Sequence, residues 1–73
     1  MAKKDKNAVY RVTEVIGTSS ESWEDAARSA VETASKSIRD LRIAEVTKLD
    51  VKVESGKVTQ FRTRLSLSFK YGA

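Results

Sequence analysis

The 73-residue chain contains no cysteine and no histidine. Without cysteine it has neither disulfides nor thiolate metal ligands, and without histidine it lacks the commonest zinc ligand and the commonest general base. A domain of this size buries only a modest part of its surface, and its usual stabilising devices are disulfides, a bound metal or oligomerisation. Of these three, the composition favours oligomerisation.

Long apolar runs are also missing from the sequence. A membrane-spanning helix needs roughly 18 or more consecutive apolar residues, and residues 1–6 do not contain the apolar segment of a signal peptide. The lack of cysteine agrees with a reducing compartment. We therefore expect a cytoplasmic protein with no membrane partner.

Sequence motifs for catalysis are absent as well. The chain has no G-x-S-x-G nucleophile elbow, no phosphate-binding P-loop and no dinucleotide-binding glycine pattern. Its serines are most simply explained as helix caps and polar surface. We expect no catalytic residue and no enzymatic activity.

The net charge of +4 is unevenly distributed along the chain. Residues 1–7 contain three lysines and one aspartate, so half of the net charge lies there, whereas residues 8–73 are close to balanced. A nucleic-acid-binding domain usually concentrates positive charge on its folded surface. We interpret residues 1–7 as a disordered basic tail and residues 8–73 as the domain, with nucleic acid as the less favoured partner.

Residues 20–41 have the apolar spacing of an amphipathic helix. Steps of three and four place the following side chains, half of them alanine, on one stripe: Trp23, Ala26, Ala27, Ala30, Val31, Ala34, Ile38 and Leu41. Residues 18–20 (Thr-Ser-Ser) are candidate N-caps, and Thr18 is spaced from Glu21 for a capping box. We expect the rest of the chain to cover this stripe.

The segments that flank this helix predict strands. Residues 9–16 are rich in β-branched and aromatic side chains and too short for a helix. Their imperfect alternation suggests either a bulge or a strand with both faces partly buried. Residues 43–53 also alternate, but the parity of their apolar side chains changes near residues 47–48. That change predicts a second bulge or bend.

The C-terminal part of the chain predicts a β-hairpin. Residues 54–57 read Glu-Ser-Gly-Lys, a turn in which Gly56 supplies a positive φ. In residues 58–71, every second side chain contributes to one core-facing side: Phe61, Thr63, Leu65, Leu67, Phe69 and Tyr71. The resulting β-α-β-β order predicts an α+β fold in which a three-stranded antiparallel sheet wraps around one helix. Its long strands with open edges favour pairing with other subunits.

Several of these segments, taken together, resemble the dodecin family. They are Val-Ile-Gly-Thr-Ser at 15–19, the alanine stripe, Ala-Glu-Val at 44–46 and Leu-Ser-Leu-Ser-Phe-Lys at 65–70. The resemblance covers about residues 10–71, with the same element order and size. It implies a β-α-β-β subunit that assembles, through trimeric contacts, into a hollow homododecamer.

The resemblance also implies a ligand. Dodecins mostly bind flavins, such as riboflavin or FMN, stacked in pairs between aromatic side chains, and are thought to store or quench them. Flavin-binding members have a Trp just before the Phe/Ala-Glu-Val segment and a Gln on the last strand, and here Ile43 and Arg62 stand at these positions. Ile43 offers area without π-stacking, and Arg62 donates hydrogen bonds but cannot accept them. With Glu45, these residues define a degenerate flavin pocket.

The sequence is closer to a dodecin branch that lacks the flavin-stacking Trp and for which calcium has been suggested as the ligand. A hard cation needs clustered oxygen ligands. The candidate carboxylates are Glu21, Glu24 and Asp25 near the helix start, and Glu45 and Asp50 on the second strand. None matches a calcium-loop spacing, so the metal ligands stay unassigned, although symmetry could bring carboxylates from three subunits to one axis.

Two further roles stay open at this level. Trp23 is either a core or interface residue, or part of a rearranged stacking site. Arg62 and Arg64 either form salt bridges with Glu45, Asp50 or a neighbouring subunit, or hold an anionic ligand.

The sequence thus predicts a dodecin-like homo-oligomer that binds or stores a small molecule or ion and has a degenerate flavin site. A genuine flavin-storage dodecin is one alternative. A structural or nucleic-acid-interacting oligomer without a small ligand is another.

Overall fold

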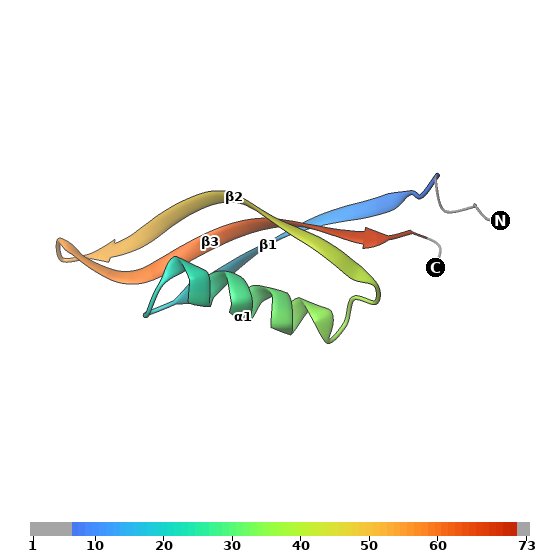
Figure 1. Ribbon diagram of the computed structural model, residues 1–73. Helices are drawn as coiled ribbons and strands as arrows, with labels where there is room; N and C mark the ends of the chain where they lie inside the picture. Colours follow the sequence, from blue (N-terminus) through green and yellow to red (C-terminus); the bar gives the residue numbers. More distant parts are fainter. Residues whose placement is uncertain (1–6, 72–73) are drawn as a thin grey trace.

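The computed structural model describes residues 7–71, and it shows one helix lying across one face of a three-stranded antiparallel sheet (Figure 1). The elements are β1 (Tyr10–Ser19), α1 (Trp23–Ser35), β2 (Leu41–Glu54) and β3 (Lys57–Lys70). The strand order is β1-β3-β2, so β3 is central and both of its neighbours are edge strands. The predicted α+β architecture is confirmed. The predicted basic tail lies, apart from Asn7, outside the described residues.

The core lies between β3 and α1. Leu65 and Leu67 on β3 and Ala26 and Ala30 on the helix are buried, as the alternation of the strand and the alanine stripe predict. Because alanine side chains are short, the helix approaches β1 closely at Gly17. A Cβ at that position would clash with the Ala26 carbonyl oxygen and lie 2.8 Å from the Ala30 Cβ. Glycine is therefore required at position 17 by packing.

The helix is shorter than the predicted residues 20–41. Its N-cap is Ser22, whose Oγ accepts a hydrogen bond from the Asp25 N–H at 3.0 Å. The predicted capping box between Thr18 and Glu21 is wrong, because Thr18 still belongs to β1 and pairs with Arg62 of β3. The pairing of β1 with β3 thus continues through Thr18 and Ser19, which the sequence pattern predicts as candidate N-caps of the helix.

The apolar stripe continues beyond the last helical turn. Residues 36–40 form the connection to β2, in which Asp40 adopts a φ of 59°. Ile38 from this connection and Leu41 from β2 still pack against the buried core. The apolar spacing therefore predicted which side chains face the core, but not where the helix ends.

The register of β1 is regular along its whole length. Of the two alternatives predicted for residues 9–16, the bulge is therefore wrong. Its imperfect pattern arises because Glu14 lies on the face turned away from the helix, where it forms an ion pair with Arg64 at 3.6 Å. That face remains exposed in the single chain, so a carboxylate is accommodated there.

The register of β2 is interrupted three times, at Leu41/Ile43, Val46/Lys48 and Lys52/Val53. The middle interruption is the bulge predicted near residues 47–48. The bulge inserts one extra residue into β2. As a result, Val46 before the bulge pairs with Leu65, and Leu49 after the bulge pairs with Thr63. Leu65 and Thr63 are both buried on the side of the sheet that faces the helix. The bulge thus keeps Val46 and Leu49 on the same face of β2.

The molecule is elongated, with extents of 59 × 20 × 15 Å. The β2–β3 hairpin projects past α1 at one end, while the start of β1 and the end of β3 project at the other (Figure 1). At the hairpin turn, Ser55 and Gly56 have φ values of 53° and 76°, which supports the turn predicted there. Tyr71, predicted on the core face, instead follows the end of β3 and is exposed. No helix among the described residues is long and apolar enough to cross a membrane.

Candidate functional site

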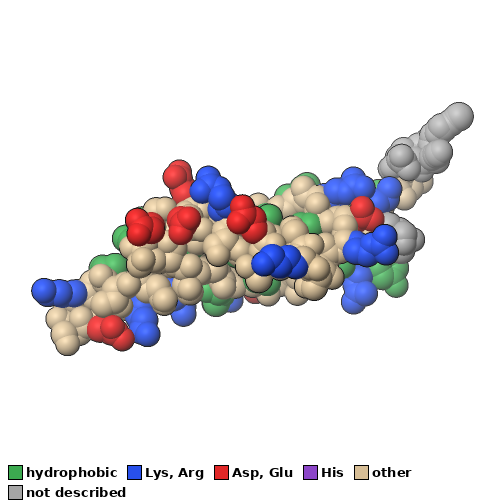
Figure 2. Space-filling model, turned by 90° about the horizontal axis from the view of Figure 1, so that it is seen from below, with side chains coloured by type: hydrophobic (Ala, Val, Ile, Leu, Met, Phe, Trp, Pro, Cys, Tyr) green, Lys and Arg blue, Asp and Glu red, His purple; other side chains and the backbone are tan. Residues whose placement is uncertain are grey.

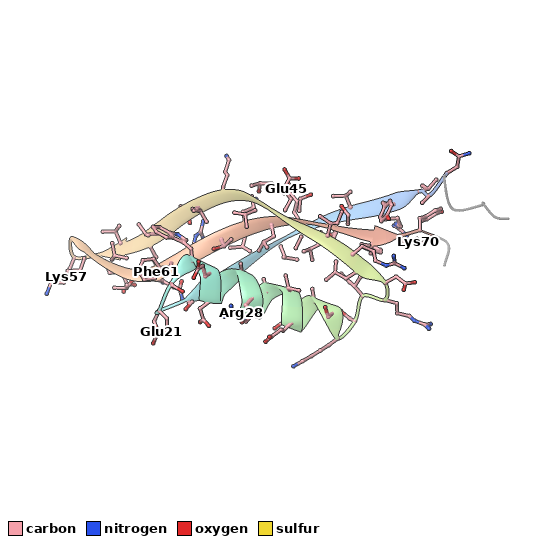
Figure 3. The ribbon with its side chains drawn as sticks, viewed as in Figure 1. Glu21, Arg28, Glu45, Lys57, Phe61 and Lys70 are labelled. Atoms are coloured by element: carbon pink, nitrogen blue, oxygen red, sulfur yellow. The ribbon has the colours of Figure 1, made fainter. Side chains whose placement is uncertain are left out.

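The three predicted pocket residues lie on the helix-free face of the sheet. Ile43 of β2 pairs with Ser68 of β3, and Glu45 lies two residues further along β2. Figure 3 shows Glu45 on the side of the sheet opposite α1. Arg62 lies six residues before Ser68 on β3, a separation of about 20 Å at the usual rise per residue. Within one chain, Ile43 and Glu45 are therefore neighbours, and Arg62 is distant from Ile43.

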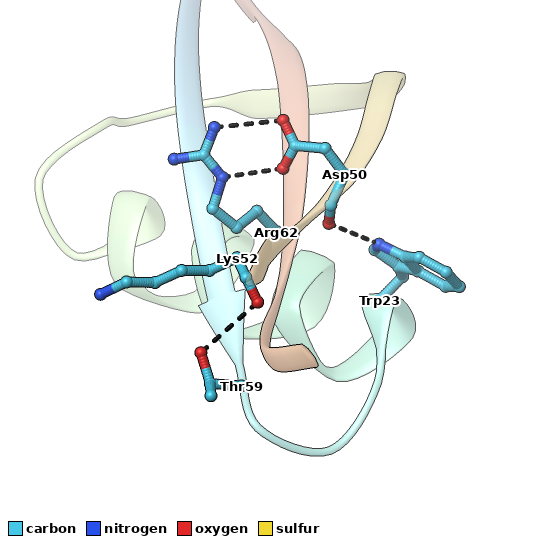
Figure 4. Close-up of polar contacts among 5 residues, drawn as sticks. All are labelled: Trp23, Asp50, Lys52, Thr59 and Arg62. Atoms are coloured by element: carbon cyan, nitrogen blue, oxygen red, sulfur yellow. Dashed lines mark hydrogen bonds and ion pairs between the residues drawn. The ribbon is translucent and has the colours of Figure 1, made fainter. Parts of the chain in front are cut away.

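Arg62 is held by Asp50 on the neighbouring strand (Figure 4). Its Nε donates a hydrogen bond to Asp50 Oδ1 at 2.7 Å, and its Nη2 donates one to Oδ2 at 3.1 Å. The hydrogen bond and the charge of Arg62 lower the pKa of Asp50 below its usual value, and Asp50 in turn raises the pKa of Arg62. Two of the five N–H donors of the Arg62 side chain are thus engaged within the chain.

Asp50 also joins the sheet to the start of the helix. Its carbonyl oxygen accepts a hydrogen bond from the Trp23 indole Nε1 at 3.0 Å (Figure 4). The indole ring meets Phe61 edge to face, with ring centroids 5.1 Å apart and an interplanar angle of 71°. Thr63 Oγ1 donates to the Trp23 carbonyl oxygen at 2.9 Å. These contacts favour the packing role of Trp23, although 38% of this residue remains exposed.

Two of the acidic residues near the helix start are hydrogen-bonded to Ser19, Asp25 through its side chain and Glu21 through its backbone N–H. Ser19 Oγ donates to Asp25 Oδ2 at 2.7 Å and accepts from the Glu21 N–H at 2.9 Å. Among the described residues, no group of three or more Asp or Glu side chains lies close enough together to hold a metal ion. The predicted carboxylates Glu21, Glu24 and Asp25 therefore do not form a calcium site within this part of one chain.

The helix-free face combines ion pairs with exposed apolar side chains. Arg62 forms an ion pair with Asp50, which was one of the partners predicted from the sequence. Arg64 instead forms an ion pair with Glu14, a partner that the sequence analysis did not predict. The exposed apolar residues are Tyr10, Val12, Ile16 and Ile43. An apolar and charged surface of this kind is suited to association with another protein surface.

Comparison with known proteins gives a consistent result. The family model for dodecin matches residues 9–72. The calcium dodecin of Mycobacterium tuberculosis is 48% identical over 64 residues, which cover 86% of this chain and 89% of that protein. A crystal structure of the M. tuberculosis protein, described as a calcium-chelating antigen with a novel calcium-binding site, has a TM-score of 0.77 at 47% identity, covering 86% of this chain and 90% of that one. Dodecin from Streptomyces coelicolor has a TM-score of 0.85 at 40% identity, covering 93% of this chain and 97% of the other.

Proposed function

The chain belongs to the dodecin family, and from this premise we propose that it is a homo-oligomeric protein that binds or stores a small molecule or ion. The oligomer is a cytoplasmic homododecamer built from trimers, and residues 8–73 form its subunit. Its flavin site is degenerate, with Ile43 and Arg62 at the positions of the usual Trp and Gln. It has no catalytic residues, and nucleic acid is not its partner.

The observation that carries the proposal is the exposure of large apolar side chains along both edge strands and the hairpin. Ile43 on β2 is 59% exposed, and Val53 and Val58 near the hairpin turn are 58% and 53% exposed. Fully burying such a side chain contributes about 1.5–3 kcal/mol, and in an isolated chain more than half of the surface of each of these three residues stays in contact with water. Other copies of the same chain would cover them.

The ligand is bound between copies rather than within one chain. Ile43 and Arg62 lie too far apart in a subunit for one flat ring system to contact both, so a pocket that uses both takes them from different subunits. Calcium is the favoured ion, because the M. tuberculosis relative is named a calcium dodecin. The absence of a three-residue acidic cluster within the described part of the chain implies that the coordinating carboxylates come from more than one copy.

Native mass spectrometry of the protein as purified tests the assembly. A mass of twelve subunits supports the proposal, and a monomer or dimer contradicts it. Flavin-sized adducts on the dodecamer would show a genuine flavin-storage dodecin, in which Ile43 and Arg62 still form a usable pocket. A flavin-free dodecamer is then titrated with calcium after treatment with a chelator, and calcium binding that saturates at a fixed number of ions per assembly supports the ion-binding form.

A further inference from the structure

The helix-free face of the sheet presents its side chains in rows, because β1 and β2 both pair with the central strand β3. Three successive rows are an apolar row of Val12, Ser68 and Ile43, an acidic row of Glu14, Ser66 and Glu45, and a basic row of Ile16, Arg64 and Lys48. Arg62 comes next on β3, beside Asp50. The character of this face therefore changes from apolar to acidic to basic along the sheet.

Glu45 lacks a cationic partner among the described residues. No Lys or Arg nitrogen in this part of the chain lies within 4.0 Å of its carboxylate. The other carboxylate of its row, Glu14, is paired with Arg64 at 3.6 Å. A charged group that becomes buried in an assembly needs a partner, because an unpaired buried charge is costly. Glu45 would therefore need a cation from outside its own chain.

Arg62 has donors left for such a carboxylate. Asp50 accepts from its Nε and Nη2, so three of the five guanidinium N–H groups remain unused within the described chain. Figure 4 shows the third guanidinium nitrogen of Arg62 pointing away from Asp50. Because Asp50 already holds the guanidinium in place, binding a second carboxylate costs little additional ordering entropy.

The two groups cannot meet within one subunit. Ser66, the partner of Glu45 on β3, lies four residues from Arg62, which is about 13 Å along the strand. A second copy, however, presents both groups on the same face. A face that carries both members of a pair is self-complementary, so two copies can supply each other's missing partner.

The surroundings of Glu45 favour a second copy as the occupant of this face. Val12 and Ile43, which flank Ser68 in the neighbouring row, are 61% and 59% exposed. On the helix side of the molecule, by contrast, charged side chains of both signs are spread over the surface with only small apolar areas between them (Figure 2). The helix-free face thus combines apolar area with complementary charges, as a specific protein interface does.

We propose that Glu45 of one subunit forms an ion pair with Arg62 of a second subunit, so that their helix-free faces pack against each other. Arg62 then lies between Asp50 of its own chain and Glu45 of the partner subunit. The degenerate flavin pocket is in this way closed by protein charges. The inference rests on the proposed homo-oligomer and adds which residues meet at one of its interfaces.

Disulfide crosslinking of Glu45→Cys/Arg62→Cys tests the contact. The natural chain contains no cysteine, so the two introduced thiols are the only ones present. Within one chain these positions are farther apart than the Cα separation of about 7 Å that a disulfide tolerates. After mild oxidation, a denaturing gel without reductant should therefore show covalently linked subunits, and reduction should return single subunits.

Two kinds of control accompany this variant. Glu45→Cys/Arg28→Cys has the same number of thiols, but position 28 lies on the helix, on the other side of the sheet from Glu45 (Figure 3). It should stay unlinked, as should each single variant. Linking by Glu45→Cys alone would overturn the proposal, because Glu45 would then face its own copy.

The failures of this inference and of the proposed function are distinguishable. An assembled oligomer whose thiols at positions 45 and 62 stay unlinked and react with a maleimide reagent would overturn the inference alone. The face would then be open to a different partner. A parent protein that is monomeric in native mass spectrometry would overturn the proposed function and the inference with it.

Because Arg62→Cys also removes the partner of Asp50, a milder variant provides an independent measurement. Glu45→Gln keeps the size of the side chain and removes its charge. At a fixed urea concentration, the protein concentration at which the oligomer half-dissociates should rise about tenfold, as expected for loss of a charged hydrogen bond. Glu32→Gln makes the same change on the exposed side of α1 and should leave this concentration unchanged. Equal values for Glu45→Gln and the parent would contradict the ion pair.

Discussion

At the scale of single residues, Asp50 connects its own strand both to β3 and to the start of the helix. It accepts two hydrogen bonds from Arg62 through its carboxylate and one from Trp23 through its carbonyl oxygen. Only the carboxylate contacts depend on pH. Its pKa is lowered from 3.8, first by the hydrogen bond from Arg62 and then by the nearby positive charges. The stability that the Asp50–Arg62 ion pair contributes is therefore fully present above pH 3.8, the pKa of Asp50 in the unfolded chain. It is lost as the pH falls through the lower pKa that Asp50 has in the folded protein.

Asp50→Asn tests this dependence. The variant should have a lower melting temperature than the parent at pH 7, and the difference should shrink as the pH is lowered below 3.8, because protonated aspartate has also lost its charge. The measurement is thermal unfolding at a fixed protein concentration between pH 7 and pH 2. Glu32→Gln, a change of the same charge on the exposed side of the helix, is the control. A difference that stays constant over the whole range would contradict the role of the ion pair.

The degenerate flavin pocket is also a prediction at the residue scale. Ile43→Trp together with Arg62→Gln restores the aromatic surface and the hydrogen-bond acceptor, so riboflavin affinity should rise well above that of the parent. The measurement is quenching of riboflavin fluorescence on titration. Each single variant serves as a control, and Arg62→Gln also frees Asp50 from its ion pair. Quenching that is the same in the double variant and the parent would refute the alignment of Ile43 and Arg62 with the flavin contacts.

At the scale of elements, the start of α1 is determined by where β1 ends. Pairing of β1 with β3 continues to Ser19, so the helix cannot begin at the first cluster of capping residues. Ser22 then caps the helix, and Ser19 stays in the strand and binds the side chain of Asp25. The three serines of this segment, Ser19, Ser20 and Ser22, thus have different roles that their identity alone does not reveal.

Ser22→Ala and Ser20→Ala distinguish these roles. Loss of the Ser22 cap should lower the free energy of unfolding by about 1 kcal/mol. Ser20 is exposed and is not the N-cap, so its replacement should stay within about 0.5 kcal/mol of the parent. Urea unfolding of both variants at one protein concentration gives the comparison. A larger loss in the Ser20 variant would show that the helix begins earlier in solution.

At the scale of the whole molecule, one chain is too extended to be a compact unit. A compact domain of this length has a radius of gyration of about 11 Å, whereas the described chain has 15.4 Å. The excess comes from strands that project beyond both ends of the helix (Figure 1). Association with other copies is the means by which such strands bury their apolar side chains.

Val53→Asp tests whether the projecting hairpin is part of a subunit interface. Because Val53 is 58% exposed in one chain, the change should alter the subunit fold little, but a buried charge should abolish assembly. Native mass spectrometry and circular dichroism measure the two effects. Ser55→Asp adds the same charge at the turn, at a φ of 53° that aspartate tolerates, and should leave the assembly intact. A Val53→Asp dodecamer would mean that the hairpin lies outside the interfaces.

The candidate site was only partly predictable from the sequence. The pairing of Arg62 with Asp50 was one of several open alternatives, because a register shift at Lys52/Val53 decides which residues face each other across the hairpin. The partner of Arg64 was missed, because Glu14 lies on β1 and only the central position of β3 brings them together.

The sequence by itself determined the order of the elements, the core-facing side of β3, the alanine stripe and the turn at residues 55–56. These features depend on local periodicity and on backbone conformations of single residues, which a short segment expresses by itself. Only the tertiary structure decided the sheet order, the length of α1, the regular register of β1 and the ion pairs of the helix-free face. These depend on contacts between distant segments, and such contacts overrode local preferences at both ends of the helix.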